Sequence, residues 1–141
     1  MRGEHYGRVN WKYEDEKAKP LVYVIGPYET GDHLRNTKRA IDAGDFVISQ
    51  GGIAIIPHLS HFHDERSPHS REYWLEMGLA LLKTCQYAVR ILGHSPGGDA
   101  EQAQAIEDSQ PVFLLNYLDY NITQDKYIFD FRNPDANFLG R

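Results

Sequence analysis

The stretch YAVRILGHSPGGDAE, residues 87–101, decides the fold of this chain. Its first six residues form an apolar run typical of a buried strand, and a Pro/Gly turn follows. Beyond the turn a helical pattern begins, with a carboxylate, Glu101, in its predicted first turn. Glycines at a strand-to-helix junction leave backbone N–H groups free, and the start of a helix adds positive potential. The junction therefore suits an anionic or polyhydroxylated ligand.

Strands and helices alternate outward from this stretch. Apolar, β-branched runs predict further buried strands at 21–25, 53–57 and 111–115. Helical spacing of apolar residues predicts helices at 34–50, 70–85 and 99–109. Gly51-Gly52 supplies a stop for the first of these helices. Uniformly apolar strands that alternate with helices predict a small, doubly wound α/β fold, with a parallel sheet of four to five strands and helices on both faces.

The two ends of the chain differ in character from this central region. Residues 20–115 are assigned to the α/β domain, and residues 1–19 to a polar N-terminal arm. Residues 116–141 form an aromatic and polar extension, in which one short strand is plausible near 127–131.

Charge and composition restrict the class of partner. The 141 residues carry 15 basic and 20 acidic side chains, a formal net charge of −5, which argues against duplex DNA or an anionic membrane surface. The single cysteine, Cys85, lies late in an apolar helical pattern and is predicted to be a buried free thiol. Since no apolar run approaches the roughly 20 residues that span a bilayer, and no signal peptide is recognisable, we expect a cytoplasmic protein.

Ligands of such a sheet bind outside the carboxyl ends of its strands. These ends are Gly26-Pro27-Tyr28, Pro57-His58 and the turn at 93–99, so three loops distant in sequence are expected to converge on one crevice. Neither G-x-G-x-x-G nor G-x-x-x-x-G-K-[ST] is present, and the chain gives no support to dinucleotide or nucleoside triphosphate binding of those kinds.

The segment 58–69 is rich in histidine and is predicted to form a mobile loop. Its possible ligands for a divalent metal are His58, His61, His63, His69, Asp64 and Glu65. A second ligand cluster downstream is lacking, so the pattern favours a solvated loop, or a lid in which one histidine contacts substrate.

Glu101 and Tyr23 are the candidate catalytic pair. A glutamate at the start of a helix often only complements the helix dipole, but here Ser95 and two glycines precede it at the functional edge of the sheet. A carboxylate so placed could attack a sugar C1′ and form a glycosyl-enzyme intermediate. Tyr23 lies two residues before its strand ends, and its hydroxyl could orient that carboxylate, or its ring could simply pack in the core.

The helix predicted at 70–85 contributes further candidates. Trp74 fits the apolar stripe and is expected to pack in the core, whereas Tyr73 or Glu76 could line the crevice and contact a base.

Three segments, 23–27, 73–82 and 85–103, together resemble the nucleoside 2-deoxyribosyltransferase superfamily, especially its small branch described as DUF4406. The resemblance covers roughly residues 20–115. It implies a flavodoxin-like fold, a covalent glycosyl-glutamate mechanism without a cofactor or metal, and assembly into a dimer or larger homo-oligomer. The aromatic segment 117–138 could help to close a neighbour's pocket.

The resemblance also implies roles for individual residues. Glu101 falls on the nucleophile and Tyr23 on the tyrosine that orients it, while the Gly97-Gly98 turn lets the backbone approach the sugar. The full set of predicted substrate-binding residues is Gly26, Pro27, His58, Ser95, Gly97, Gly98 and Asp99.

Ser95 bears on the substrate. In this superfamily, deoxyribosyltransferases tend to carry Asp six residues before the nucleophile, whereas relatives that hydrolyse nucleoside 5′-monophosphates carry Ser, which receives the phosphate. A neutral hydroxyl beside a helix N-terminus tolerates a dianion better than a carboxylate does. Ser95 therefore favours a phosphorylated substrate.

The chain departs from the superfamily pattern at two positions. Gly78 stands where an acidic residue usually contacts the base, and Gln86 stands where Asp often follows the cysteine. Without an acid at residue 78, the proton for the leaving base must come from Glu76, a loop histidine or water.

The leading hypothesis is cleavage or transfer at the N-glycosidic bond of a (deoxy)nucleoside or nucleoside 5′-monophosphate, with water or a second base resolving the intermediate. One alternative is a nucleotide-binding or regulatory module of the same fold with weak or lost turnover. The other is a metal-dependent hydrolase that uses the histidines of 58–69.

Overall fold

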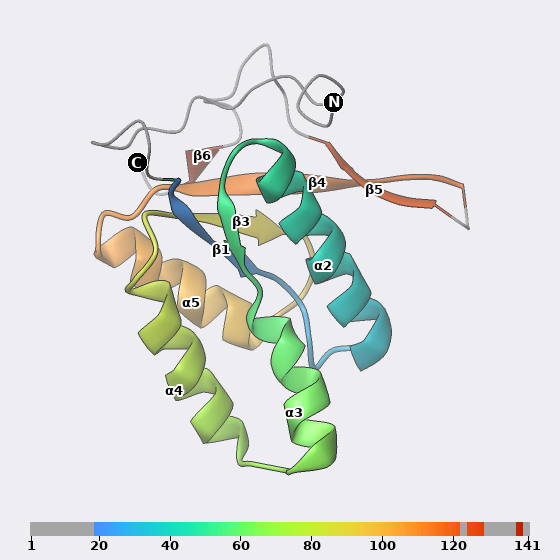
Figure 1. Cartoon of the computed structure of the whole chain (residues 1–141), viewed down its shortest axis with the longest axis vertical. Coiled ribbons are helices and arrows are strands. Elements are labelled where there is room, and N and C mark those ends of the chain that lie inside the picture. The colour runs from blue at the N-terminus through green and yellow to red at the C-terminus, as the bar shows by residue number, and fades with distance from the viewer. Residues whose placement is uncertain (1–18, 122–123, 129–137, 140–141) are drawn as a thin grey trace.

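A computed structural model of the chain describes residues 19–121, 124–128 and 138–139, with side chains described for 19–115 (Figure 1). The predicted arm at 1–19 lies outside these residues except for Lys19, and the side chains of the aromatic segment 117–138 all lie outside the described ones.

The centre of the fold is a parallel sheet with the strand order β2-β1-β3-β4. The strands are β1 (Leu21–Ile25), β2 (Ile53–Ile55), β3 (Tyr87–Ile91) and β4 (Val112–Asn121). Two antiparallel strands, β5 (Gln124–Ile128) and β6 (Phe138–Leu139), pair with β4. The predicted flavodoxin-like, doubly wound α/β fold is therefore confirmed, although β4 continues six residues beyond its predicted end and β5 begins before residue 127.

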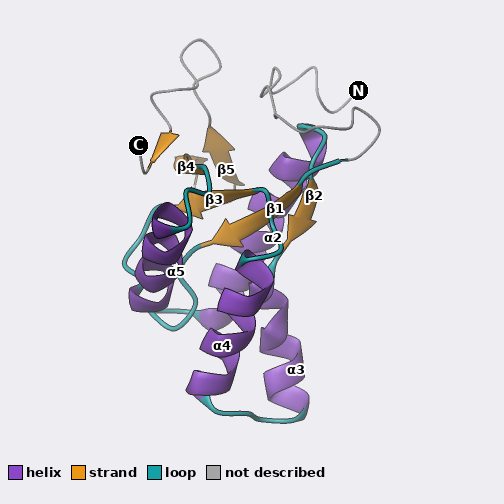
Figure 2. Ribbon diagram, turned by 90° about the vertical axis from the view of Figure 1, so that its left-hand side faces the viewer, coloured by secondary structure: helices purple, strands orange, loops and turns teal. Residues whose placement is uncertain are grey.

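Helices cover both faces of the sheet (Figures 1 and 2). Helix α2 (His33–Ser49) packs on one face against Val22 and Val24, while α4 (Arg71–Leu82) and α5 (Pro96–Glu107) lie on the other, with Tyr23 and Ile25. Since successive side chains of a strand point to opposite faces, β1 contributes to both cores. Both faces are apolar because both are covered.

The helix boundaries follow from caps. Asp32 caps α2 by accepting hydrogen bonds from the N–H groups of Leu34 and Arg35, and Gly51, with φ +89°, follows its end as predicted. Ser95 caps α5 in the same way, so that helix begins at Pro96 rather than at the predicted residue 99. Glu101 is consequently the sixth residue of α5 and lies in its second turn, so the prediction that Glu101 stands in the first turn is wrong; the first-turn carboxylate is Asp99.

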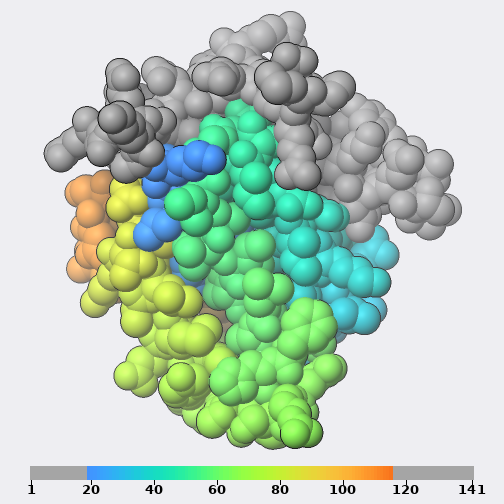
Figure 3. Space-filling view, viewed as in Figure 1, coloured from blue at the N-terminus to red at the C-terminus, as the bar shows by residue number. Residues whose placement is uncertain are grey.

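The histidine-rich segment is helical over residues 58–66, so the prediction of a loop over 58–69 is wrong for all but its last three residues. It forms the short 3₁₀ helix η1 (Pro57–Leu59) and α3 (Ser60–Arg66). In the space-filling view of Figure 3, the side of the molecule that faces the reader shows α3 (green) together with α2 (cyan) and α4 (yellow-green). Tertiary contacts hold α3: His61 bonds to the hydroxyl of Tyr28, and Asp64 accepts from the Trp74 indole. A segment stabilised by polar tertiary contacts carries little apolar periodicity, which explains the error.

Two further predictions concern the described residues. Cys85 is a buried free thiol, as expected. Among the residues that the structure describes, no helix has the length and apolar character needed to cross a membrane.

The same substitution, isoleucine to alanine, tests whether the central strand β1 is buried more deeply than the edge strand β2. Ile25 is fully buried, whereas Ile53 is 44% exposed. Ile25→Ala is expected to lower the free energy of unfolding by about 2–5 kcal/mol, because it leaves a cavity in the core. Ile53→Ala is the matched control and should cost less than half as much in urea denaturation; equal losses would contradict the described core.

Candidate active site

A cleft opens at the carboxyl ends of β1, β2 and β3, between α3, α4 and the start of α5. Its free volume, including the part open to solvent, is about 790 Å³. Of the residues predicted from sequence, those that line it are Tyr23, Gly26, His58, Ser95, Gly97, Gly98 and Glu101. Those that do not line it are Pro27, Asp99, Tyr73 and Glu76. The three loops thus converge as the sheet topology requires.

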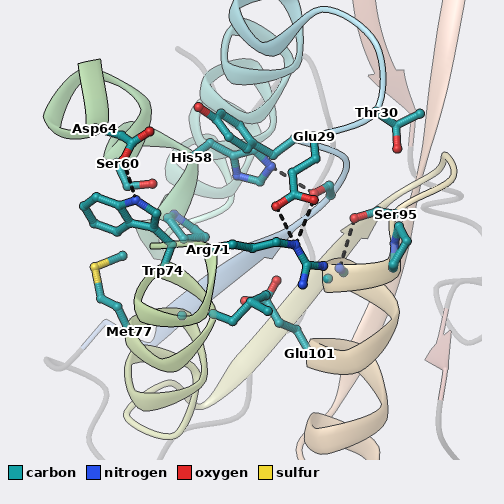
Figure 4. Close-up of a pocket in the computed structure, with 18 of the residues that line it drawn as sticks. Glu29, Thr30, His58, Ser60, Asp64, Arg71, Trp74, Met77, Ser95 and Glu101 are labelled. Atoms are coloured by element: carbon teal, nitrogen blue, oxygen red, sulfur yellow. Dashed lines mark hydrogen bonds and ion pairs between the residues drawn. The ribbon is translucent and has the colours of Figure 1, made fainter. Parts of the chain in front are cut away.

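Tyr23 and Glu101 are joined by a hydrogen bond in this cleft. Tyr23 is fully buried on β1, and its hydroxyl donates to Oε2 of Glu101, which points from α5 toward α4 (Figure 4). Burial, and then the charge of Glu101 and its hydrogen bond, raise the pKa of Tyr23 well above its usual value. The phenol therefore keeps its proton and acts as the donor; its ring packs in the core at the same time.

Burial raises the pKa of Glu101 to about 7, although the Tyr23 hydrogen bond and the charge of Arg90 both act in the opposite direction. Both protonation states of this carboxyl group are therefore populated near neutral pH. In the second turn of α5 it is not a cap, so the dipole-complementing interpretation of this residue no longer holds.

Gly78 lies directly against the pair. A Cβ atom on this residue would be 2.9 Å from Glu101 Oε2 and 2.9 Å from the Tyr23 hydroxyl oxygen. The Glu101 carboxylate and the Tyr23 hydroxyl group thus occupy the place that a side chain at residue 78 would take. Glu76, on the same helix, is exposed and does not line the cleft, so neither position supplies an acid there.

The loop between β3 and α5 is fixed by a buried arginine. Arg90 is 6% exposed; its Nε donates to the carbonyl of Ile91, and its Nη2 donates to the carbonyl of Gly93 and pairs with Asp99 Oδ1 at 3.1 Å. Asp99 therefore neutralises Arg90 rather than lining the cleft. Sequence reasoning missed Arg90 because it stands in a strand that otherwise reads as apolar.

Ser95 and Gly98 make the first turn of α5 compact. The Ser95 hydroxyl oxygen accepts from the N–H of Gly98 at 3.0 Å, which leaves its own hydrogen available as a donor. A Cβ on Gly98 would lie 2.8 Å from that oxygen and 2.9 Å from Nη1 of Arg90. The position therefore requires glycine.

His58 connects η1 to the end of β1. It is 5% exposed, and its Nε2 lies 3.0 Å from the carbonyl oxygen of Gly26 and 3.1 Å from that of Pro27. Burial lowers the pKa of His58, so the ring is neutral, and the two carbonyl partners assign its proton to Nε2. Pro27 in turn packs against Gly93, where a Cβ would come within 2.7 Å of its ring.

The α4 wall of the cleft was only partly predicted. Arg71, Trp74, Leu75 and Gly78 all line it, at the spacing i, i+3, i+4 and i+7 of one helical face. Trp74 is half-buried and faces the cleft rather than the core, contrary to expectation. Residues three, four and seven positions before Gly78 share its helical face, so this spacing would have predicted the other α4 residues that line the cleft.

Asp64 lies on the opposite side, on α3. It accepts hydrogen bonds from the N–H of His69 at 2.9 Å and from the Trp74 indole at 2.8 Å, and these bonds hold its pKa below the usual range. Asp64 is therefore a carboxylate and not a proton donor at neutral pH.

Tyr28 lines the cleft, as its place at the end of β1 predicts, and it begins a chain of polar contacts. Its hydroxyl lies 2.8 Å from His61 Nδ1, and His61 Nε2 lies 3.2 Å from Oε1 of the exposed Glu65. Burial, and then the charges of nearby carboxylates, raise the pKa of Tyr28. This chain runs from the cleft to the surface.

The histidines of α3 and its flanks do not converge. His58 and His61 are engaged as described above, while His63 and His69 pack edge-on against the Trp74 ring. Within the described part of the chain, no three His, Cys, Asp or Glu side chains are grouped so that they could hold a metal ion.

Fold and cleft define a flavodoxin-like α/β protein with its candidate site at the carboxyl edge of a parallel sheet. Residues 20–115 match the family described as a domain of unknown function (DUF7768), and the chain belongs to that family. This is a different description from the DUF4406 branch that the sequence resembles, and it assigns no superfamily or activity. A comparison with curated protein sequences found no match.

Gly78→Ala is expected to disrupt the Tyr23–Glu101 pair. The fully buried Tyr23 has no room to move aside, and overpacking of about 1–3 kcal/mol outweighs the roughly 1 kcal/mol that alanine contributes to helix propensity. Gly44→Ala, inside α2, is the control, because its Cβ would meet the rotatable end of Ile56. Urea denaturation should show a lower free energy of unfolding for Gly78→Ala than for Gly44→Ala, and the reverse order would contradict this packing.

The charges around Glu101 predict opposite shifts of its titration. Arg90→Gln removes a cation that favours the carboxylate, so the pKa of Glu101 should rise above about 7. Asp99→Asn leaves the Arg90 charge uncompensated, so the pKa should fall. The measurement is ¹³C NMR titration of the side-chain carboxyl, assigned with Glu101→Gln. Glu107→Gln is the control, because it removes one negative charge, as Asp99→Asn does, at the exposed end of α5, and it should leave the pKa of Glu101 unchanged. Shifts of the Glu101 pKa in the same direction in Arg90→Gln and Asp99→Asn would contradict the electrostatic explanation.

Proposed function

We propose that this protein is an enzyme that cleaves or transfers the N-glycosidic bond of a (deoxy)nucleoside or nucleoside 5′-monophosphate, with Glu101 as its nucleophile. The observation that carries the proposal is the Tyr23–Glu101 hydrogen bond inside a cleft at the carboxyl edge of the sheet. The resemblance of residues 23–27, 73–82 and 85–103 to the nucleoside 2-deoxyribosyltransferase superfamily supports the same assignment.

In the proposed reaction, a carboxylate oxygen of Glu101 attacks C1′ of the sugar, and the C1′–N bond breaks with its electron pair leaving on the base. Tyr23 occupies Oε2 as a donor, which orients the carboxylate and leaves Oε1 for attack. Water, or the nitrogen of a second base, then attacks C1′ of the glycosyl-glutamate and releases Glu101.

The departing base needs a proton, and only some of the residues that line the cleft carry one that they could donate. Asp64 is ionised, and the Nε2 proton of His58 is held by backbone carbonyls. Tyr28 retains its proton, and His61 connects it to Glu65 at the surface. We propose that the Tyr28 hydroxyl group gives its proton to the departing base and takes one back from Nδ1 of a His61 ring protonated from the solvent side.

A nucleotide-binding module without turnover is the second candidate. It is favoured by Gly78, which places helix backbone, and no acid, beside the carboxylate. Binding of a nucleotide without release of base would support it.

Substitution of Glu101 tests the proposed reaction. Glu101→Ala and Glu101→Gln are expected to lower base release from nucleosides and 5′-monophosphates by roughly 10³-fold or more, because both remove the nucleophile. In the wild-type enzyme, kcat/KM should rise with pH through about 7 as Glu101 ionises.

Chromatographic detection of free base is the measurement, and mass spectrometry should find a glycosyl group on the peptide that contains Glu101. Glu107→Gln serves as the control and should retain full activity. Base release by both Glu101 variants at the wild-type rate would refute the nucleophile assignment.

A further inference from the structure

Arg71 extends across the cleft from the first residue of α4 to the loop that follows β1. Its Nε lies 2.9 Å from Oε1 and 3.0 Å from Oε2 of Glu29, a residue 42 positions earlier in the chain. Both side chains line the cleft and are about half exposed. The contact therefore joins two walls of the cleft at its mouth.

Only one nitrogen of the guanidinium is used in this contact. Nε donates to both oxygens of Glu29, whereas Nη1 and Nη2 have no hydrogen-bond partner within the described part of the chain. Figure 4 shows the guanidinium between Glu29 and Glu101, on the side of the cleft where α5 begins. Four N–H donors are thus held in a fixed orientation without a protein acceptor.

Arg71 is a positive charge in a cleft whose other charged side chains are carboxyl groups. Three carboxyl groups, those of Glu29, Asp64 and Glu101, line it, and of the described lining residues Arg71 alone carries a permanent positive charge. An anionic ligand would meet repulsion from the carboxylates unless its charge were placed against Arg71. Because Glu29 engages Nε alone, an anion can bind Nη1 and Nη2 without breaking the pair.

We propose that Arg71 binds the phosphate group of a nucleoside 5′-monophosphate through Nη1 and Nη2, and that Glu29 is a positioning residue that holds the guanidinium in place. The planar fork of an arginine matches two phosphate oxygens. The inference rests on the proposed function and names the substrate class of that site.

The test compares each 5′-monophosphate with its parent nucleoside. Arg71→Gln is expected to lower kcat/KM for the monophosphate by about 10- to 100-fold, the value of a lost charge-assisted contact, and to leave the nucleoside within about threefold of wild type. Arg71→Lys keeps the charge but loses the fork, so its loss should be intermediate. Glu29→Gln should raise KM for the monophosphate with kcat retained, because it releases the guanidinium without touching the reacting atoms.

Arg66→Gln is the matched control, an exposed arginine of α3 that does not line the cleft, and it should leave both substrates unchanged. Equal losses for nucleoside and monophosphate in Arg71→Gln, or no loss in either, would overturn the role of Arg71 while leaving the proposed reaction intact.

If the wild-type protein releases no base, the proposed reaction is refuted. The affinities of the same variants for the monophosphate and the nucleoside are then measured by calorimetry. Tighter binding of the monophosphate than of the nucleoside, lost in Arg71→Gln and retained in Arg66→Gln, would still establish the phosphate site. Absence of that preference in the wild type would overturn it.

Discussion

The hydrogen bond from Tyr23 to Glu101 is the interaction on which the rest of the site depends. It connects β1 to α5 across 78 residues of sequence and places a carboxyl group in a largely desolvated position. A buried carboxyl group is tolerated only with polar partners, and here these are one phenol and one nearby guanidinium, that of Arg90. Because burial still dominates, the group is poised near neutrality instead of being fully ionised. Gly78 belongs to the same constraint, since any side chain there would separate the pair.

Two arginines, Arg90 and Arg71, lie near the carboxyl groups of the site, and they differ in exposure. Arg90 is buried at the β3–α5 loop, where it contacts both the Gly93 carbonyl and Asp99, and its charge lowers the pKa of Glu101. Arg71 lies at the mouth, paired through one nitrogen with Glu29 and open on the others. The first is nearly inaccessible to a ligand, and the second is half exposed. A cleft lined by three carboxyl groups thus retains one fixed positive charge at its mouth.

Local patterns in the sequence were sufficient for the architecture and for part of the site. Apolar runs of strand length predicted the four parallel strands, and the glycine stop predicted the end of α2. The sheet topology then implied that the strand ends meet, which brought Tyr23, His58 and Ser95 to one cleft. The start of α5 was misplaced because Pro96 and the two glycines read as a turn, whereas the Ser95 cap makes them the first helical turn. The histidine-rich segment was misread because polar contacts rather than an apolar stripe make it helical.

The sequence by itself determined the order of strands and helices and the edge of the sheet at which the cleft lies, because hydrophobic periodicity is a local property and the sheet topology follows from the element order. Only the tertiary structure decided that Trp74 faces the cleft, that Gly78 touches the Tyr23–Glu101 pair, and that Arg71 reaches Glu29. These facts depend on how α4 is rotated and how closely it approaches α5 and the β1–α2 loop. Rotation and approach are set by packing between elements that are distant in the chain, so no local pattern encodes them.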